Sequence, residues 1–271
     1  MQTVTLLHRV CRFCAVFAVV ALLMPTLPLP VQASPGYAYH WRVQFDFENN
    51  FNGLLIVEVG YNENGAVQQP SLHSRTFIVG CQRVGSVGLS GGVAKFSGGY
   101  LACDLDVKSA VEQTFAACDE LHPGCKLAIG DVEQYRSLAL AADLSAAATG
   151  VAPILGHPSV AYAVNVATST HTVQTALAPI GTINSSGWGV APALNTSYHS
   201  SVRYVCSLAG DCGAHFNIAG NPEYVNTADA PVNFVMTPST LTIGHDLSGA
   251  TVVAGSTIDN ILIDPGNGLP E

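Results

Sequence analysis

Two aspartates separated by one residue form the sequence feature with the clearest chemical meaning. Asp104 and Asp106 stand at positions i and i+2, which on a β-strand places both carboxylates on one face. Carboxylates about 5–10 Å apart serve glycosidases as acid and as base or nucleophile, and Glu112 is close in sequence. A plainer interpretation is a solvated strand face, with Asp106 capping a following helix. We favour that interpretation and assign no catalytic residue.

Residues 88–92 (Gly-Leu-Ser-Gly-Gly) match the G-x-S-x-G pattern of serine hydrolases. That motif works only where a strand turns sharply into a helix and lifts the serine oxygen toward a histidine. The residues that follow, 93–96, are typical of a strand. We therefore expect the glycines to form a loop between strands.

Trp188 is the best local indication of ligand binding. It lies in the segment 185–189 (Ser-Ser-Gly-Trp-Gly), where an exposed ring would offer a flat face for a sugar to stack on. The alternative is a ring that turns inward and closes one end of the fold. We expect the inward position and keep Trp188 as the candidate ligand-binding residue.

Metal-ligand patterns are weak throughout the chain. The histidines after residue 33 are scattered, without H-x-H or H-E-x-x-H spacing. Asp259, Asp264 and Asn267 carry oxygen atoms that suit Ca²⁺, but no D-x-D-x-D-G loop accompanies them. We therefore predict no metal and no cofactor.

The first 33 residues predict export. Arg9 and Arg12 precede an apolar run over 13–24, and the segment 31–33 (Val-Gln-Ala) provides the small residues of a cleavage site. This is the pattern of a secretory signal peptide, and the apolar run is shorter than the roughly 20 residues that span a bilayer. We expect residues 1–33 to be cleaved and residues 34–271 to form a single secreted, extracytoplasmic domain without membrane insertion.

Six of the eight cysteines follow residue 33. An even number in an exported chain indicates disulfides, although six cysteines allow 15 pairings. Short turn-bearing segments separate two of the pairs, so we expect the bridges Cys118–Cys125, Cys206–Cys212 and, by elimination, Cys81–Cys103.

The composition excludes some partners. The chain has 10 Lys and Arg against 19 Asp and Glu, a formal net charge of −9. Such a surface repels phosphate backbones, so nucleic acid is a poor partner. We expect an extracellular glycan or protein instead.

Hydrophobic patterns predict a mainly β fold. Between residues 39 and 48, large apolar and polar side chains alternate, which indicates a strand with one buried face. Further β-prone runs alternate with turn residues: 54–61, 75–84, 93–96, 100–107, 160–167, 172–176, 201–207, 214–218, 232–236, 241–243 and 258–263. This spacing favours an antiparallel β-sandwich.

One helix is expected, over residues 106–121. Val107, Val111, Phe115 and Cys118 form its apolar stripe, and the segment 122–124 (His-Pro-Gly) ends it. Residues 131–147 are ambiguous, because their Ala and Leu content favours a helix without a consistent period. Residues 148–158 are expected to form a connector.

Two short strings resemble laminin G-like and concanavalin A-like jelly-roll modules. Residues 91–100 (Gly-Gly-Val-Ala-Lys-Phe-Ser-Gly-Gly-Tyr) are similar to a Gly-x-Ala-x-Phe-x-Gly strand entry, and residues 256–263 (Ser-Thr-Ile-Asp-Asn-Ile-Leu-Ile) to the closing strand of those modules. The strings cover about twenty residues. The resemblance implies a jelly roll and, by analogy of fold alone, carbohydrate or protein binding.

These observations predict a secreted, non-catalytic binding or surface module of unknown ligand, with carbohydrate as the candidate. Two alternatives remain. One is a secreted carbohydrate-active hydrolase that uses paired carboxylates such as Asp104 and Asp106, and the other is a structural envelope or adhesion component.

Overall fold

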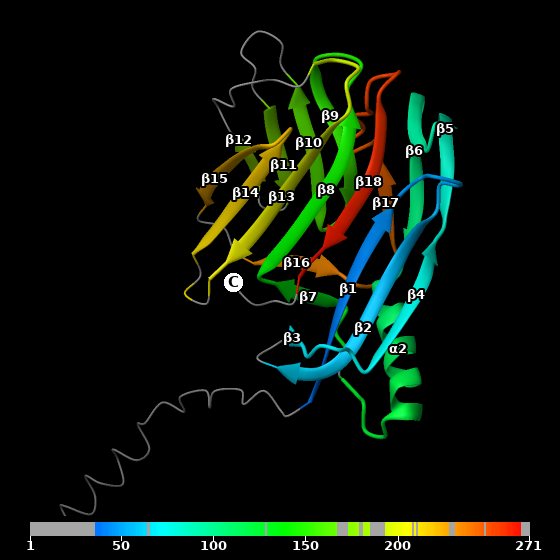
Figure 1. The fold of residues 1–271 in the computed structure, drawn as a ribbon, viewed down its shortest axis with the longest axis vertical. Coiled ribbons are helices and arrows are strands. Elements are labelled where there is room, and N and C mark those ends of the chain that lie inside the picture. Colours follow the sequence, from blue (N-terminus) through cyan, green and yellow to red (C-terminus); the bar gives the residue numbers. More distant parts are fainter. Residues whose placement is uncertain are drawn as a thin grey trace, which may run out of the picture. The chain divides into compact units, whose positions relative to one another are not determined.

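The computed structural model describes residues 36–63, 66–127, 129–166, 173–178, 181–184, 193–207, 209, 211–227, 231–246 and 248–266. These described residues form one compact unit. The described part is mainly antiparallel β-structure with a single helix at its side (Figure 1). This confirms the predicted antiparallel, jelly-roll-like β-sandwich with a peripheral helix.

The elements follow one another along the chain as β1 (Tyr37–Phe45), β2 (Gly53–Glu63), β3 (Ala66–Val67), β4 (His73–Val79), β5 (Cys81–Ser90), β6 (Val93–Leu105), α2 (Val107–Leu121), β7 (Val132–Tyr135), β8 (Ser137–Ser145), β9 (Gly150–His157), β10 (Val160–Val166), β11 (Val173–Ala178), β12 (Gly181–Asn184), β13 (Tyr198–Cys206), β14 (Cys212–Ile218), β15 (Asn221–Thr227), β16 (Val232–Val235), β17 (Ser239–Ile243) and β18 (Thr257–Asp264).

Most strands belong to one continuous sheet in the order β12-β11-β10-β9-β17-β6-β18-β8-β13-β14-β15, while β7 and β16 pair separately. The sheet folds into two layers, with β8, β13 and β14 in front of β9, β10 and β11 in Figure 1. Side chains of both layers, such as Leu140 and Tyr162, join one buried cluster. This shared core holds the layers together by burying apolar surface.

The first strand shows how the sequence determines a face. Trp41, Val43 and Phe45 are buried, whereas Gln44 is exposed and Arg42 half-buried. Successive residues of a strand point to opposite sides, so the alternation in the sequence becomes a core face and a solvent face. The strand pairs with β2 on one edge and with β18 on the other.

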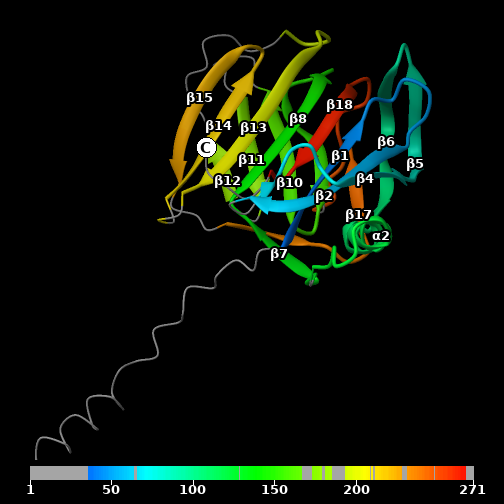
Figure 2. The same cartoon turned by 60° about the horizontal axis from the view of Figure 1, so that its bottom comes forward.

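The helix α2 begins and ends where the sequence predicts. Asp106 is the N-cap, and its Oδ1 accepts a hydrogen bond from the Ser109 N–H at 3.0 Å. The buried side of α2 carries the expected apolar stripe from Val107 to Cys118. This side packs against β2 and β4, and Figure 2 shows the helix along its axis. Within the described residues, no helix combines the length and the apolar character needed to cross a membrane.

Three disulfides join the cysteines in the predicted pairs, Cys81–Cys103, Cys118–Cys125 and Cys206–Cys212. The first links β5 to β6 and the third links β13 to β14, in each case between residues that are direct backbone partners. The second fastens the end of α2 to the segment that follows. Each bridge therefore joins segments that already lie side by side.

The structure decides one ambiguous segment and corrects two expectations about elements. Residues 131–147, which the sequence left ambiguous, contain β7 and β8, because Leu138, Leu140 and Leu144 follow a period of two and all face the core. Residues 148–158, expected to be a connector, contain the largely buried strand β9. Residues 75–84 are divided between β4 and β5 at Gly80, since β4 pairs with β2 and β5 with β6.

The strand β18 has two neighbours along one edge. Residues 257–258 pair with β6, whereas residues 261–263 pair with β1. The other edge pairs with β8, with a shift of register between Asp259 and Leu262. Asn260 lies at this shift with φ of 48°, a left-handed conformation that asparagine tolerates better than most residues. The sheet therefore forks at residues 259–260, where β1 and β6 diverge from a common partner.

Candidate functional site

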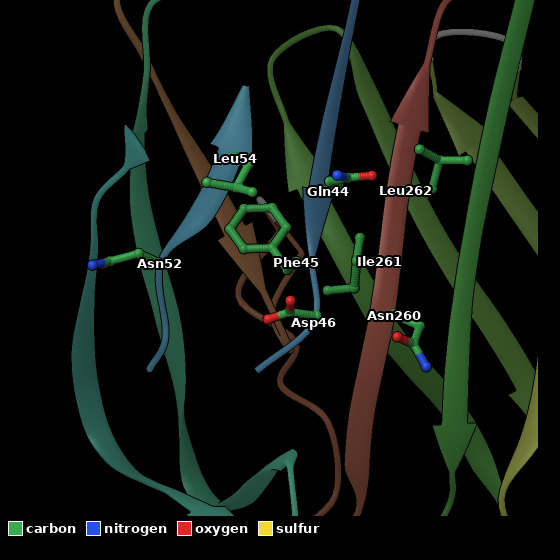
Figure 3. A pocket seen from close by; sticks show the side chains of 8 residues that line it. All are labelled: Gln44, Phe45, Asp46, Asn52, Leu54, Asn260, Ile261 and Leu262. Carbon is green, nitrogen blue, oxygen red and sulfur yellow. The ribbon is translucent and has the colours of Figure 1, made fainter. Parts of the chain in front are cut away.

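A pocket of about 400 Å³ lies at the fork, between the end of β1 and β18. Its lining combines side chains that form hydrogen bonds with apolar side chains. Figure 3 shows these residues, which come from β1, the segments beside it, β2 and β18: Gln44, Phe45, Asp46, Asn52, Leu54, Asn260, Ile261 and Leu262. We name this the fork pocket.

Backbone pairing places three lining residues in one row across the sheet. Gln44 of β1 is the partner of Leu54 on β2 and of Leu262 on β18. Paired residues share a face, so the three side chains project to the same side, which is the solvent face. Gln44 and Leu54 are exposed and Leu262 is half-buried. The row thus offers one amide between two apolar side chains.

The amide side chains of the pocket differ in how they are held. Asn52 Oδ1 accepts the Cys81 N–H at 3.1 Å, an interaction that fixes its side chain and leaves its NH₂ group to donate. Asn260 Nδ2 donates to Asp143 Oδ2 at 2.7 Å. Gln44 has no side-chain hydrogen bond to any described residue. Its donor and acceptor groups are therefore available to a ligand.

The floor of the pocket depends on a glycine. Phe45 is 2% exposed, and its ring lies against Gly53 so closely that a Cβ added to Gly53 would stand 2.4 Å from the ring. Only a residue without a side chain allows this approach. Gly53 therefore fixes the ring of Phe45 beneath the residues that face the solvent.

Four carboxylates, here named the acidic rim, surround this end of the fork: Asp46, Glu48, Asp143 and Asp259. Asp46 lines the pocket, and its Oδ1 accepts the Glu48 N–H at 3.4 Å. Asp143 and Asp259 are backbone partners on β8 and β18.

The rim is electrostatically crowded. Burial is the largest cause of a raised pKa at Asp259, opposed by a hydrogen bond with the backbone of Asn260. The charges of the other three rim carboxylates raise this pKa further. The Oδ1 atom of Asp259 is buried without a hydrogen-bond partner among the described residues. Among those residues Asp143 alone of the four forms an ion pair, with His199 Nδ1 at 2.8 Å.

A histidine between two carboxylates lies on the same face of β1. His40 Nε2 is 2.7 Å from Asp264 Oδ1, and His40 Nδ1 is 3.5 Å from Glu58 Oε2. Burial would lower the pKa of His40, but the hydrogen bonds and charges of the two carboxylates outweigh it and raise the pKa. The cluster joins β2, β1 and β18, so its contacts hold together the strands that carry the fork pocket.

The aspartates singled out in the sequence line a different pocket, of about 320 Å³, together with Ser239 and Thr240. Asp104 is exposed on β6, and Asp106 is committed to capping α2. The capping role matches the plainer of the two interpretations of this pair.

A histidine beside this second pocket does not activate its serine. His157 is 2% exposed, and its Nε2 lies 2.8 Å from Ser239 Oγ. The Ser159 N–H donates to His157 Nδ1 at 3.1 Å, so the proton of the neutral ring is on Nε2, which donates to Ser239. Burial lowers the pKa of His157 to about 4. The ring therefore has no lone pair directed at Ser239 with which to remove its proton.

The other sequence candidates are dispersed. Ser90 is exposed at a hairpin between β5 and β6, with no helix after it, as expected for a loop between strands. Trp188 lies outside the described residues, so its position stays a prediction. Asp264 bonds His40 and Asp259 belongs to the acidic rim, while Asn267 is also outside the described part. No group of residues suited to a metal ion occurs within that part.

Sequence reasoning missed the fork pocket, although one signal for it was present. Alternation places Gln44 on the solvent face, but nothing in the spacing indicates that it meets β18. In β18 the buried isoleucines are Ile258, Ile261 and Ile263, at spacings of three and then two. A break in the period of two indicates an inserted residue, which is how the bulge at Asn260 could have been found.

Comparisons with known proteins identify no family. No family model matches the sequence, and no curated protein matches it. The laminin G-like resemblance therefore stays a prediction.

Solved structures with a similar arrangement of strands are distant. A Trypanosoma rangeli sialidase in complex with 2,3-difluoro-KDN shares 13% identity over 82% of this chain and 30% of its own, with a TM-score of 0.37. A botulinum neurotoxin type C structure, whose title concerns two ganglioside molecules, shares 10% over 83% and 48%, with a TM-score of 0.43.

The alginate lyase Aly36B shares 12% identity over 85% of this chain and 98% of its own, with a TM-score of 0.38. The chain thus spans less than half the length of the sialidase and the toxin chain. At TM-scores below 0.5, none of these structures assigns a function to the protein.

Proposed function

We propose that the protein is a non-catalytic carbohydrate-binding module whose ligand occupies the fork pocket. The observation that carries the proposal is the pocket lining, in which amide and carboxylate groups stand beside Leu54 and Leu262. Sugars present hydroxyl groups and apolar C–H faces together, so they need both kinds of partner. The volume of about 400 Å³ falls within the range of roughly 300–1,000 Å³ that is usual for small-molecule sites.

Binding without turnover is favoured by the number of carboxylates in the lining. Asp46 is the one carboxylate among the lining residues. Hydrolysis of a glycosidic bond requires an acid and a second carboxylate on opposite sides of that bond. In the second pocket, the carboxylate of Asp106 caps the N-terminus of α2. The hydrolase is therefore the second candidate, and it rests on Asp104 and Asp106 lining one pocket.

A glycan array tests the proposal with three proteins. The wild-type chain should bind a defined subset of glycans. The double variant Gln44→Ala/Asn52→Ala should lose that binding by at least about tenfold, because it removes two amide groups that would form hydrogen bonds to the ligand. The control Gln134→Ala removes an equally exposed amide on β7 and should bind like wild type. An array without any bound glycan would contradict the module and favour a structural role. Cleavage of a bound glycan would favour the hydrolase.

We also propose that the module works outside the cytoplasm. The signal peptide expected over residues 1–33 lies outside the described residues, and the disulfides fit an oxidising compartment. N-terminal sequencing of the exported protein should therefore begin at Ser34 or within a few residues of it. Recovery of the chain with Met1 intact from the cytoplasm would contradict export.

A further inference from the structure

Within the described residues, the acidic rim has few compensating cations. Among the residues that the structure describes, Asp46, Glu48 and Asp259 form no ion pair, and the one partner of Asp143 is His199. The charges of Asp143, Asp46 and Glu48 all raise the pKa of Asp259, as acidic neighbours do. Carboxylates that repel one another in this way attract a cation and disfavour an anion at the pocket beside them.

The rim is connected to the pocket through specific contacts. Asp46 is part of the lining, and Asn260, another lining residue, donates to Asp143 Oδ2. Glu48 is held close to Asp46 through its backbone N–H. A positive group in the fork pocket would therefore lie next to Asp46 and within the field of the other rim carboxylates.

The remaining lining residues define what else the ligand carries. The amides of Gln44 and Asn52 suit hydroxyl groups, and Leu54 and Leu262 suit the apolar face of a ring. A bare metal ion would make no use of the leucines, and the described residues contain no group suited to holding a metal ion. A hydroxylated ring with an amine uses both the amides and the leucines.

We propose that the fork pocket selects glycans with free amino groups, such as oligomers of glucosamine, over N-acetylated, neutral or uronic-acid glycans. This inference rests on the proposed function. The ammonium group of the sugar lies against Asp46, the hydroxyl groups bind the amides, and the ring packs on the leucines. N-acetylation removes the charge, and a uronic acid reverses it, so both lose the attraction of the rim.

Calorimetric titration with four size-matched oligosaccharides tests the selection: oligomers of glucosamine, N-acetylglucosamine, glucose and a uronic acid. The glucosamine oligomer should bind at least about tenfold more tightly than its N-acetylated form, a difference that one close charge pair supplies. Asp46→Asn should reduce this preference several-fold, because it removes the one carboxylate of the pocket lining. The control Asp104→Asn, at the second pocket, should retain the preference.

The possible contrary results distinguish failure of the amine selection from failure of carbohydrate binding. Equal affinity for the amino and N-acetyl oligomers would overturn the inference and leave carbohydrate binding intact, whereas no binding of any oligosaccharide would remove the proposed function itself. Titration of the wild-type chain with CaCl₂ alone should give no binding heat. Binding heat that disappears in Asp259→Asn would show that the rim is a metal site and would overturn the inference. Equally tight binding of a lysine-rich peptide would show general attraction of cations and would also overturn the inference.

Discussion

His40 shows how one side chain connects three strands. Its two ring nitrogens face Asp264 on β18 and Glu58 on β2, while its backbone belongs to β1. A protonated ring donates to both carboxylates, whereas a neutral ring donates to one only. The charge of His40 therefore contributes to the stability of the sheet beside the fork pocket.

The raised pKa of His40 predicts a pH dependence of stability. The folded chain binds this proton more tightly, so the stabilisation is complete below the unfolded pKa of about 6.5 and is lost as the pH rises through the folded pKa. Although burial opposes it, the contact with His40 lowers the pKa of Asp264, and this contribution disappears as the pH falls below about 4.

The variant His40→Gln should therefore reduce the free energy of unfolding by about 2 kcal/mol near pH 5.5 and by less near pH 9. Urea denaturation of both proteins at the two pH values measures the difference. A cost that is equal at both values would show that the charge of His40 has no role.

Gly53 provides a second prediction at the same scale. Gly53→Ala places a Cβ against the ring of Phe45, which is packed in the core and has no room to move, so we expect a loss of about 1–3 kcal/mol. The matched control is Gly88→Ala on β5, where a Cβ meets nothing within 4 Å. Chemical denaturation of both variants should separate them, and equal stabilities would contradict the close contact.

Single residues also show the limit of sequence reasoning. The pattern of β1 places Gln44 on the solvent face and Trp41 in the core, and both positions are observed. The contact of Gln44 with β18 depends on which strands pair across a long stretch of chain. The alternation of apolar and polar residues carries no information about that pairing. The face of Gln44 could be predicted, but the site to which it belongs could not.

At the scale of elements, the cap of α2 gives a direct test of the two aspartates. Asp106→Ala removes the acceptor of the Ser109 N–H and should cost about 1 kcal/mol of unfolding free energy. Asp104→Ala, two residues earlier in the same pocket, should change stability by less than about 0.5 kcal/mol because Asp104 is exposed. If the two variants are equally destabilised, the capping assignment is wrong.

Elements with local sequence signals could be predicted, whereas elements determined by burial could not. The stripe and cap of α2 are local signals, and the helix begins within one residue of its expected start. In residues 131–147 the many alanines favour a helix, but Leu138, Leu140 and Leu144 gain more by facing the opposite layer than the backbone gains from its intrinsic preference. Burial determines whether such a segment forms a helix or a strand, and burial depends on strands that lie elsewhere in the chain.

At the scale of the molecule, the shared core predicts cooperative unfolding. Side chains of both layers, of α2 and of the β7–β16 pair belong to one buried cluster. Trp41 also donates through Nε1 to Tyr135 on β7 at 2.8 Å. We expect thermal unfolding to give one transition, with coincident midpoints by far-UV circular dichroism and by tryptophan fluorescence. Two separated midpoints would show that the layers unfold independently.

The position of β18 has a consequence for the order in which the protein is made. This strand is synthesised after the other strands described here, yet it lies between β8 on one edge and β1 and β6 on the other. A ribosome that has not passed residue 257 has therefore produced three strand edges without their partner. We therefore expect the sheet to close at the fork only after this late strand has been made.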